Sequence, residues 1–222
     1  MRSCPASPHM VDPIPNGVDV ERLATGAHAK GSYALSLGRV CPEKAFHLAL
    51  DAAHQAGMPL LLAGQVFPYD LHLKYFNQQI VPRLDRMRRF VGPLRFSRKR
   101  SLLSRARCLL ITSSVAETSS LVAMEALACG TPVVAFRSGA LPEIVDHGET
   151  GYIVDTVDEM AAALRAVDSL DPEKCRAVAR RQFSSHVMAA RYLALYEQLI
   201  SSKCRQPLQT VGASDQLWVA TS

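Results

Sequence analysis

Six short apolar segments that alternate with helix-like segments constrain the fold of this chain more than any other feature. Their continuously apolar character is typical of strands in a parallel sheet that is covered on both faces. They cover residues 33–38, 59–64, 88–91, 107–112, 131–136 and 152–155. The helix-like segments lie near 43–56, 68–82, 97–105, 119–129 and 140–146. This alternation predicts an α/β fold, with a Rossmann-like doubly wound parallel sheet of about six strands and helices on both faces.

The two ends of the 222-residue chain differ in pattern from its middle, which is long enough for one sizeable core. Residues 1–30 are expected to form a lead-in and a linker, because segment 13–19 (PIPNGVD) combines two prolines with an Asn-Gly turn signal. Residues 31–204 are expected to form the Rossmann-like domain, which ends in a helical tail with a long helix at 184–201. Residues 205–222 are expected to be disordered.

The composition predicts a soluble protein of the reducing cytoplasm. Hydrophobic residues make up 48% of the chain and charged residues 20%, the apolar runs are too short to span a bilayer, and no signal-peptide core is expected. The six cysteines form no C-x-x-C pair and the histidines show no ligand spacing, so neither a disulfide scaffold nor a zinc site is predicted. Cys108 and Cys129 are interpreted as core residues. The formal charge of +5 suits an anionic ligand, and no nucleic-acid partner is expected.

The stretch 115–136 (VAETSSLVAMEALACGTPVVAF) predicts an anion-binding site, because a hydroxyl-rich turn leads into an alanine-rich helix pattern and then a buried strand. The first amides of such a helix point outward, with the positive end of the helix dipole behind them, which suits a phosphate. Glu125 lies about four residues into the helix, roughly 6 Å from those amides. That distance matches the step from a diphosphate to its ribose. The predicted order is sugar at Glu117, diphosphate at Ser120–Val122 and ribose at Glu125.

This E-x7-E pattern, together with the C-G-T-P-V-V-A-F segment after it, resembles the signature of the family 4 retaining glycosyltransferases, which have the GT-B fold. The resemblance implies that the first glutamate contacts the donor sugar, that the following amides hold the diphosphate and that the second glutamate binds the ribose. The donor-binding residues implied here are Glu117, Ser119, Ser120, Leu121, Val122 and Glu125. Ser119 and Ser120 replace the usual Phe and Gly, and a serine hydroxyl can itself donate to a phosphate oxygen. Two surface glutamates beside an ordinary core helix are the less favoured alternative.

The loop after the first predicted strand carries a second charged group. Segment 38–44 (GRVCPEK) places Arg39 at the strand end and Lys44 in the first turn of the next helix. Two cations there can offset the charge of a diphosphate, and Gly38 leaves room for it. The segment resembles the family's G-R-x-x-x-E-K motif, with Ala45 in place of the common Gly, and the resemblance implies that the arginine and the lysine bind donor phosphates. Solvated cations at a helix N-terminus are the alternative for either residue alone.

Three further segments fit the same family. Segment 138–152 resembles its G-G-x-P-E-I-V-x-x-G-x-x-G stretch, in which Glu143 is predicted to shape the pocket wall rather than to act in catalysis. Gly92 follows a strand where the nucleotide base often packs in the family. Segment 13–19 resembles the linker between the two halves of a GT-B enzyme. The resemblance therefore covers only the C-terminal, donor-binding half, and a complementary N-terminal-type domain or subunit is an expected partner.

Residues 83–100 form a strongly basic run, with eight basic side chains and one acidic side chain. A solvated face is the first interpretation. A dock for an anionic membrane surface or a lipid-phosphate acceptor, and a surface for a partner protein, are the alternatives.

The leading hypothesis is the donor-binding half of a retaining glycosyltransferase that moves a sugar from a UDP, GDP or ADP type donor to an acceptor. Arg39, Lys44 and Glu117 are the predicted catalytic residues, since the two cations can stabilise the leaving diphosphate while the glutamate orients the sugar. The chain has no D-x-D motif, and neither a metal nor another cofactor is predicted. Because the acceptor site belongs to the other half in this family, the chain alone is expected to bind nucleotide but to transfer sugar poorly.

Two other classes of function stay open. The first is a non-catalytic nucleotide-binding or assembly module that pairs with a separate chain through apolar residues of helix 184–201, such as Val187, Tyr192, Leu195 and Tyr196. The second, a dinucleotide-dependent oxidoreductase, shares such a sheet, but the chain lacks G-x-G-x-x-G after its first predicted strand.

Overall fold

One parallel sheet of six strands organises the structure, a computed structural model that describes residues 12–24 and 30–204. The predicted lead-in at 1–11 and the predicted tail at 205–222 lie outside the described residues. The strands are β1 (Ala34–Leu37), β2 (Leu60–Ala63), β3 (Arg88–Gly92), β4 (Leu109–Ile111), β5 (Val133–Phe136) and β6 (Gly151–Val154). They pair in the order β3-β2-β1-β4-β5-β6. The predicted fold class is confirmed.

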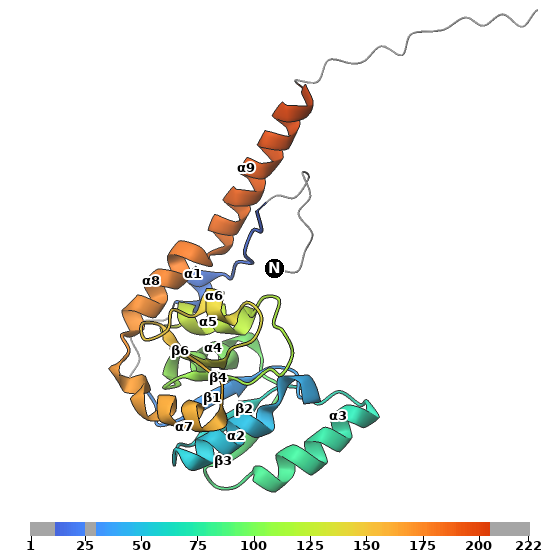
Figure 1. The fold of residues 1–222 in the computed structure, drawn as a ribbon, viewed down its shortest axis with the longest axis vertical. Coiled ribbons are helices and arrows are strands. Elements are labelled where there is room, and N and C mark those ends of the chain that lie inside the picture. The colour runs from blue at the N-terminus through green and yellow to red at the C-terminus, as the bar shows by residue number, and fades with distance from the viewer. Residues whose placement is uncertain (1–11, 25–29, 205–222) are drawn as a thin grey trace, which may run out of the picture.

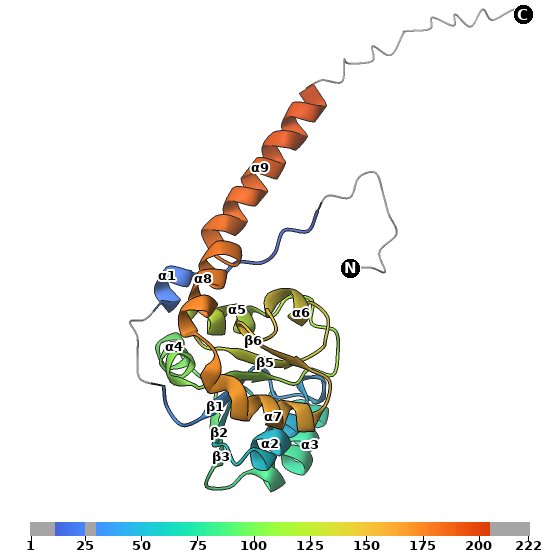
Figure 2. The ribbon, with the colours of Figure 1, turned by 60° about the vertical axis from the view of Figure 1, so that its left-hand side comes forward.

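Helices cover both faces of this sheet (Figures 1 and 2). The helices are α1 (Val20–Leu23), α2 (Phe46–Gln55), α3 (Asp70–Tyr75), α4 (Phe96–Arg105), α5 (Leu121–Ala128), α6 (Leu141–Ile144), α7 (Val157–Ala166), α8 (Pro172–Gln182) and α9 (Ser185–Cys204). One core cluster joins the sheet to α1, α4, α5, α6 and α8, and a second joins it to α2, α3 and α7. The continuously apolar strands therefore bury both of their faces.

The sheet has a switch point between β1 and β4. Strand β1 pairs with β2 on one side and with β4 on the other, so the loops that leave β1 and β4 turn toward opposite faces. In open α/β sheets such a point leaves a crevice at the carboxyl ends of the strands, and ligands bind there. The two segments singled out in the sequence, 38–44 and 115–125, follow these two strands.

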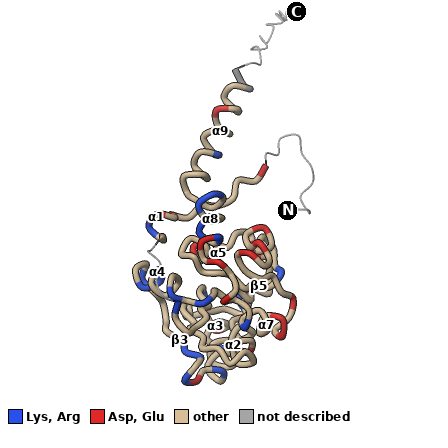
Figure 3. Tube along the Cα trace, turned by 90° about the vertical axis from the view of Figure 1, so that its left-hand side faces the viewer, with Lys and Arg blue, Asp and Glu red and all other residues tan. Residues whose placement is uncertain are grey.

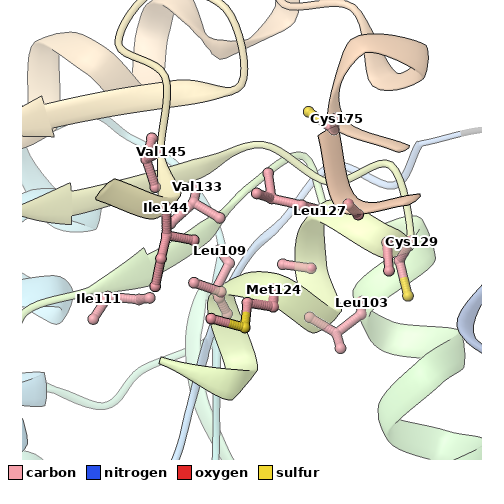
Figure 4. Close-up of a cluster of buried hydrophobic side chains, with 14 of the residues drawn as sticks. Leu103, Leu109, Ile111, Met124, Leu127, Cys129, Val133, Ile144, Val145 and Cys175 are labelled. Atoms are coloured by element: carbon pink, nitrogen blue, oxygen red, sulfur yellow. The ribbon is translucent and has the colours of Figure 1, made fainter. Parts of the chain in front are cut away.

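Helix α5 packs between the sheet and α8, and its buried face is shown in Figure 4. Leu127 is fully buried there, as is Cys129, which follows the helix. Cys108, on the other face, is also fully buried, so the predicted core role of both cysteines is confirmed. Burial raises the pKa of Cys108 and Cys175 to about 12 and the pKa of Cys129 to about 11, so these thiols stay protonated near neutral pH.

The helical segment predicted at 68–82 is confirmed as one uninterrupted run of helical backbone, whose hydrogen-bond pattern changes along its length. Helix α3 ends at Tyr75 and is followed by a π-helical turn, Phe76–Ile80, and a 3-10 turn, Val81–Arg83. Pro82 lies in the 3-10 turn, where it has no amide to donate to a regular helical hydrogen bond. Tyr75 and Ile80 nevertheless stay buried against α2 and β2, so the whole segment still covers one face of the sheet.

The predicted linker is partly built into the domain. Val18 donates its amide to the Phe183 carbonyl at 2.8 Å and accepts from the Ser185 amide at 2.9 Å, which fixes this segment at the start of α9. A Cβ on Gly17 would lie 2.7 Å from the Ser185 Cα, so only glycine allows this approach. The short helix α1 then buries Leu23 in the core. This helix is absent from the sequence interpretation, since four residues are too few to show a periodic pattern.

Helix α9 projects away from the sheet (Figures 1 and 2). It begins directly after Ser184, the predicted N-cap, whose hydroxyl accepts from the His186 amide at 3.2 Å. Several of its large apolar side chains are exposed, namely Tyr192, Leu193, Tyr196, Leu199 and Ile200. Within the described ranges, neither α9 nor any other helix combines the length and the apolar character needed to cross a bilayer.

Lys30 gives the fold a testable dependence on pH. Its Nζ donates to the carbonyls of Ser104 at 3.2 Å and Gly130 at 2.9 Å and to the Thr131 hydroxyl at 2.9 Å. Burial, and to a smaller extent Arg176, lowers the pKa of Lys30 from 10.5 to about 8. Between these two pH values the unfolded chain holds a proton that the folded chain has released, so Lys30 makes the free energy of unfolding rise with pH.

We expect a Lys30→Met variant to lose this contribution. The measurement is urea denaturation of both proteins between pH 7 and 11, taken as the difference in their free energies of unfolding. In that difference the shared titrations of cysteine and tyrosine cancel. The free energy of unfolding of the wild type minus that of the variant should increase between about pH 8 and 10.5. A difference that stays flat over this range would contradict the lowered pKa.

Candidate functional site

The loops after β1 and β4 meet through Lys44 and Glu117. The Lys44 ammonium forms an ion pair with Glu117 Oε1, and the Ser113 hydroxyl donates to the same oxygen. The side chain of Glu117 is only 11% exposed and that of Lys44 28%, so this pair is screened less than a surface pair. The Lys44 carbonyl also accepts from the Thr112 hydroxyl at 2.9 Å. Two residues predicted to bind one donor are thus brought into contact at the switch point.

The prediction that Lys44 lies in the first turn of the next helix is wrong in detail. Lys44 ends a separate 3-10 turn, Pro42–Lys44, and α2 begins only at Phe46. Ala45 between them has φ +45°, a left-handed conformation that breaks the helix path. This turn directs the lysine side chain toward Glu117.

The strain at Ala45 leads to a prediction of stability. A left-handed residue with a Cβ costs about 1 kcal/mol or more relative to glycine, so Ala45→Gly is expected to raise the free energy of unfolding by about 1 kcal/mol. Urea denaturation measures this change. Ala49, in the middle of α2 with ordinary helical geometry, provides the matched control, because Ala49→Gly should instead destabilise by about 1 kcal/mol. A loss of stability in both variants would show that Ala45 is not strained.

Arg39 and Gly38 lie at the same strand end as Lys44. Arg39 is exposed, and among the described residues its guanidinium makes no hydrogen bond or ion pair. Gly38 follows β1 and packs against Gly64, where an added Cβ would lie 1.7 Å from the Gly38 oxygen. The two loop backbones therefore approach each other as closely as glycine permits. Arg39 is free to turn toward an anion in the crevice.

The N-terminus of α5 has free amides. Ser120 is the N-cap, but its side chain makes no capping hydrogen bond. The described part of the chain contains no acceptor for the amides of Leu121 and Val122. Unsatisfied amides at a helix start, with the dipole behind them, favour an anion. The neighbouring Ser119 hydroxyl accepts from the Asn16 side-chain amide at 3.1 Å, so the linker contacts this turn.

Glu125 forms an ion pair that the sequence did not suggest. Lys99 Nζ in α4 donates to Glu125 Oε1 at 2.6 Å, and the two side chains are 22% and 17% exposed. Lys99 belongs to the basic run 83–100, for which the sequence favours a solvated face. Arg83 and Arg88 of that run also pair, with Asp51 and Asp85, while other basic side chains remain exposed along α4 (Figure 3). No spacing rule links Lys99 to Glu125, because they lie on separate helices.

A cavity of about 630 Å³ opens beside Glu117. Its walls come from the linker, the turn before α5, α6 and the start of α9, and its lining residues include Asn16, Glu117, Ser119, Gly139, Glu143 and Arg191. Arg39, Lys44 and Glu125 do not line it. Gly92 ends β3, two strands away from β1 in the sheet. Of the predicted site residues, Glu117 and Ser119 line this cavity, so the structure does not place the whole predicted set around one cavity.

The turn at Gly139 supports Glu117 from behind. Gly139 has φ +54°, and an added Cβ would lie 2.1 Å from the Glu117 carbonyl oxygen. The next amide, that of Ala140, donates to the same oxygen at 2.7 Å. Glu143, in α6, is exposed at the cavity wall, which is the place expected for it.

Comparison with known proteins matches this arrangement to a family. A family model described as glycosyl transferases group 1 matches residues 31–169. The D-inositol 3-phosphate glycosyltransferase of Saccharomonospora viridis is 33% identical over 204 residues, which are 82% of this chain and 47% of that protein. This chain spans about half the length of the curated relatives that it matches over most of its own length.

Solved structures share the fold. AviGT4, a glycosyltransferase involved in avilamycin A biosynthesis, matches 85% of this chain and 57% of its own with a TM-score of 0.74 and 30% identity. HepE of Anabaena, solved in complex with UDP, matches 85% of this chain and 57% of its own with a TM-score of 0.72 and 24% identity. Since the family model covers more than half of the sequence, this chain belongs to the glycosyl transferases group 1 family.

Proposed function

We propose that this chain binds the donor of a retaining glycosyltransferase, a nucleotide-diphosphate sugar, and contributes the donor side of sugar transfer to an acceptor. The observation that carries the proposal is the contact of Lys44 with Glu117 at the β1/β4 switch point, beside the free amides of α5. A cation, a carboxylate and a helix N-terminus at one crevice suit a ligand that has both a diphosphate and sugar hydroxyls.

Each group has a distinct task in this proposal. The amides of Leu121 and Val122 and the Lys44 ammonium would hold the diphosphate, and the exposed Arg39 would turn in to share its charge. The leaving diphosphate gains negative charge as the bond to the sugar breaks, and fixed cations stabilise that charge most. Glu117 would orient the sugar.

Donor binding requires the two ion pairs to rearrange. The Lys44 ammonium is paired with the Glu117 carboxylate, so a diphosphate must share the ammonium with that carboxylate or displace it. The Glu117 carboxylate would then turn to the sugar hydroxyls. Lys99 likewise holds one oxygen of Glu125 and leaves the other for a ribose hydroxyl. Both pairs hold the carboxylates in a fixed direction before the ligand arrives.

The comparisons support a nucleotide donor without identifying it. HepE of Anabaena, which shares the fold, was solved with UDP, so UDP is the first nucleotide to test. The relatives are about twice as long as this chain. Transfer to an acceptor therefore requires a complementary domain or subunit in this proposal, and the isolated chain transfers sugar poorly.

Calorimetric titration of the chain with UDP, GDP and ADP tests the binding step. The proposal expects saturable one-to-one binding of at least one of these, and weaker binding of the matching nucleoside monophosphate because it lacks the second phosphate. Inorganic phosphate at the same concentration is the control for nonspecific binding. No heat from any of the three nucleoside diphosphates would overturn the proposal.

A second function, an assembly module, is favoured by one observation on α9. Tyr196 is 55% exposed and Ile200 69% exposed, and such apolar side chains on a projecting helix suit a protein partner. Analytical ultracentrifugation of the wild type and of a Tyr196→Ser/Ile200→Ser variant tests it. Self-association that the variant abolishes, without nucleotide binding by either protein, would favour this function over donor binding.

A further inference from the structure

Cys41, Glu43 and His72 meet on the outer side of the loop that follows β1. The Cys41 thiol, a Glu43 carboxylate oxygen and one ring nitrogen of His72 all lie within 4.8 Å of one another. Cys41 and Glu43 come from the 3-10 turn and its start, and His72 comes from α3, which packs against that turn. The sequence alone does not reveal this group of three residues, because His72 belongs to the βα unit after the one that carries Cys41 and Glu43.

His72 also has a ring nitrogen without a partner among the described residues. His72 Nδ1 is buried and has no hydrogen-bond partner, one of two such side-chain atoms in the described ranges. A buried polar atom without a partner costs about 1–3 kcal/mol, so it calls for a ligand or a solvent molecule at that point. The rings of Phe67 and Tyr69 hold the imidazole edge-on, with ring centroids 6.5 Å and 5.2 Å away, which limits its rotation.

The other two groups already interact with each other. The Cys41 side chain is fully buried, and its thiol contacts the Arg39 carbonyl at 3.6 Å and the Glu43 carboxylate. Glu43 is exposed, so its carboxylate can rotate inward. The backbone of Glu43 is already fixed, because its carbonyl accepts from the Ser114 amide at 2.9 Å and the Ser114 hydroxyl at 3.2 Å.

We propose that Cys41, Glu43 and His72 form a binding site for one zinc ion. Sulfur, nitrogen and carboxylate oxygen in one set match the ligands of zinc, and three protein ligands leave a fourth tetrahedral position for water. Ligand atoms around tetrahedral zinc lie about 3.5 Å apart, so a rotation of the exposed Glu43 side chain and small shifts of the others complete the geometry. A thiolate and a carboxylate together neutralise the charge of Zn²⁺.

The zinc ion would fasten the loop that carries Arg39 and Lys44 to the start of α3. Cys41 and Glu43 lie between these two cations in the sequence, and His72 comes from α3. Zinc binding and nucleotide binding are separate measurements, so a failure to bind zinc would not by itself overturn the proposed donor site.

Zinc titration of the reduced, chelator-treated full chain tests the site. Calorimetry is expected to show one equivalent of Zn²⁺, and Cys41→Ser, His72→Gln and Glu43→Gln should each weaken binding at least about tenfold. His54→Gln, at an exposed histidine of α2, is the matched control and should bind as the wild type does. Circular dichroism of each metal-free variant checks that it folds. If Cys41→Ser does not fold, the other two variants decide.

Cobalt gives a second readout that reports on the thiolate. Co²⁺ bound by the wild type should show a thiolate charge-transfer band, which Cys41→Ser should abolish and His54→Gln should keep. No saturable Zn²⁺ binding would overturn the site. Binding that none of the three ligand variants weakens would overturn it too, since the ion would then sit on cysteines or histidines elsewhere in the chain.

Discussion

Replacing Lys44 by alanine is expected to weaken UDP binding by about ten- to a hundredfold. A hydrogen bond to a charged group contributes about 1.5–3 kcal/mol, and each 1.4 kcal/mol changes a dissociation constant tenfold. Lys44 is partly buried at the switch point, where its charge is screened less than that of a surface lysine. Calorimetric titration of UDP measures the change. Lys174→Ala is the control, because Lys174 is 55% exposed and pairs with Glu149 at 3.6 Å, its one ion-pair partner among the described residues.

Glu117 gives the opposite expectation for the same measurement. Its carboxylate now competes with any diphosphate for Lys44, so Glu117→Gln should bind UDP as tightly as the wild type or more tightly. A Lys44→Ala variant with wild-type affinity would remove the lysine from the donor site. A Glu117→Gln variant that loses affinity as Lys44→Ala does would show that the ion pair matters for folding of the loop rather than for the ligand.

Gly139→Ala is expected to destabilise the protein by about 2 kcal/mol more than a matched glycine substitution elsewhere. Both Gly139 and Gly57 have left-handed φ angles, +54° and +63°. A Cβ at Gly57 meets nothing within 4 Å, whereas at Gly139 it would lie 2.1 Å from the Glu117 carbonyl oxygen. Gly57→Ala therefore measures the backbone strain alone, about 1 kcal/mol, and the excess in Gly139→Ala measures the collision.

Urea denaturation of the two variants gives this difference. Gly139→Ala should also displace Glu117, so its affinity for a sugar nucleotide should fall further than its affinity for UDP. Equal destabilisation by the two substitutions would mean that the turn at Gly139 yields easily and does not fix Glu117.

The sheet could be predicted because its strands are continuously apolar. Each of the six predicted segments begins within two residues of the first residue of the corresponding strand. Segment 88–91, for example, begins at the first residue of β3 and lacks only its last residue. Helix details depend on tertiary contacts instead. The predicted helix 68–82 is present, but its change to a π-helical and then a 3-10 turn could not be predicted, and α1 is too short for any periodicity to reveal it.

The site was predicted only as far as each local motif reaches. The E-x7-E pattern located Glu117 in the turn before α5 and Glu125 within α5, since a turn and a helix fix both residues. The ion-pair partners of these two glutamates could not be predicted from the sequence in the same way. Lys44 reaches Glu117 because Ala45 is left-handed, and Lys99 reaches Glu125 from a different helix. Contacts between separate βα units depend on how the helices pack, which no spacing in the sequence encodes.

A crystal structure of the chain with UDP tests the donor site most directly. We predict the diphosphate within hydrogen-bond distance of the Leu121 and Val122 amides and of Lys44, with the ribose hydroxyls at Glu125. The central claim would be contradicted by a nucleotide bound elsewhere, for example in the cavity between the linker and α9, while Lys44 stays paired with Glu117 and Lys99 with Glu125.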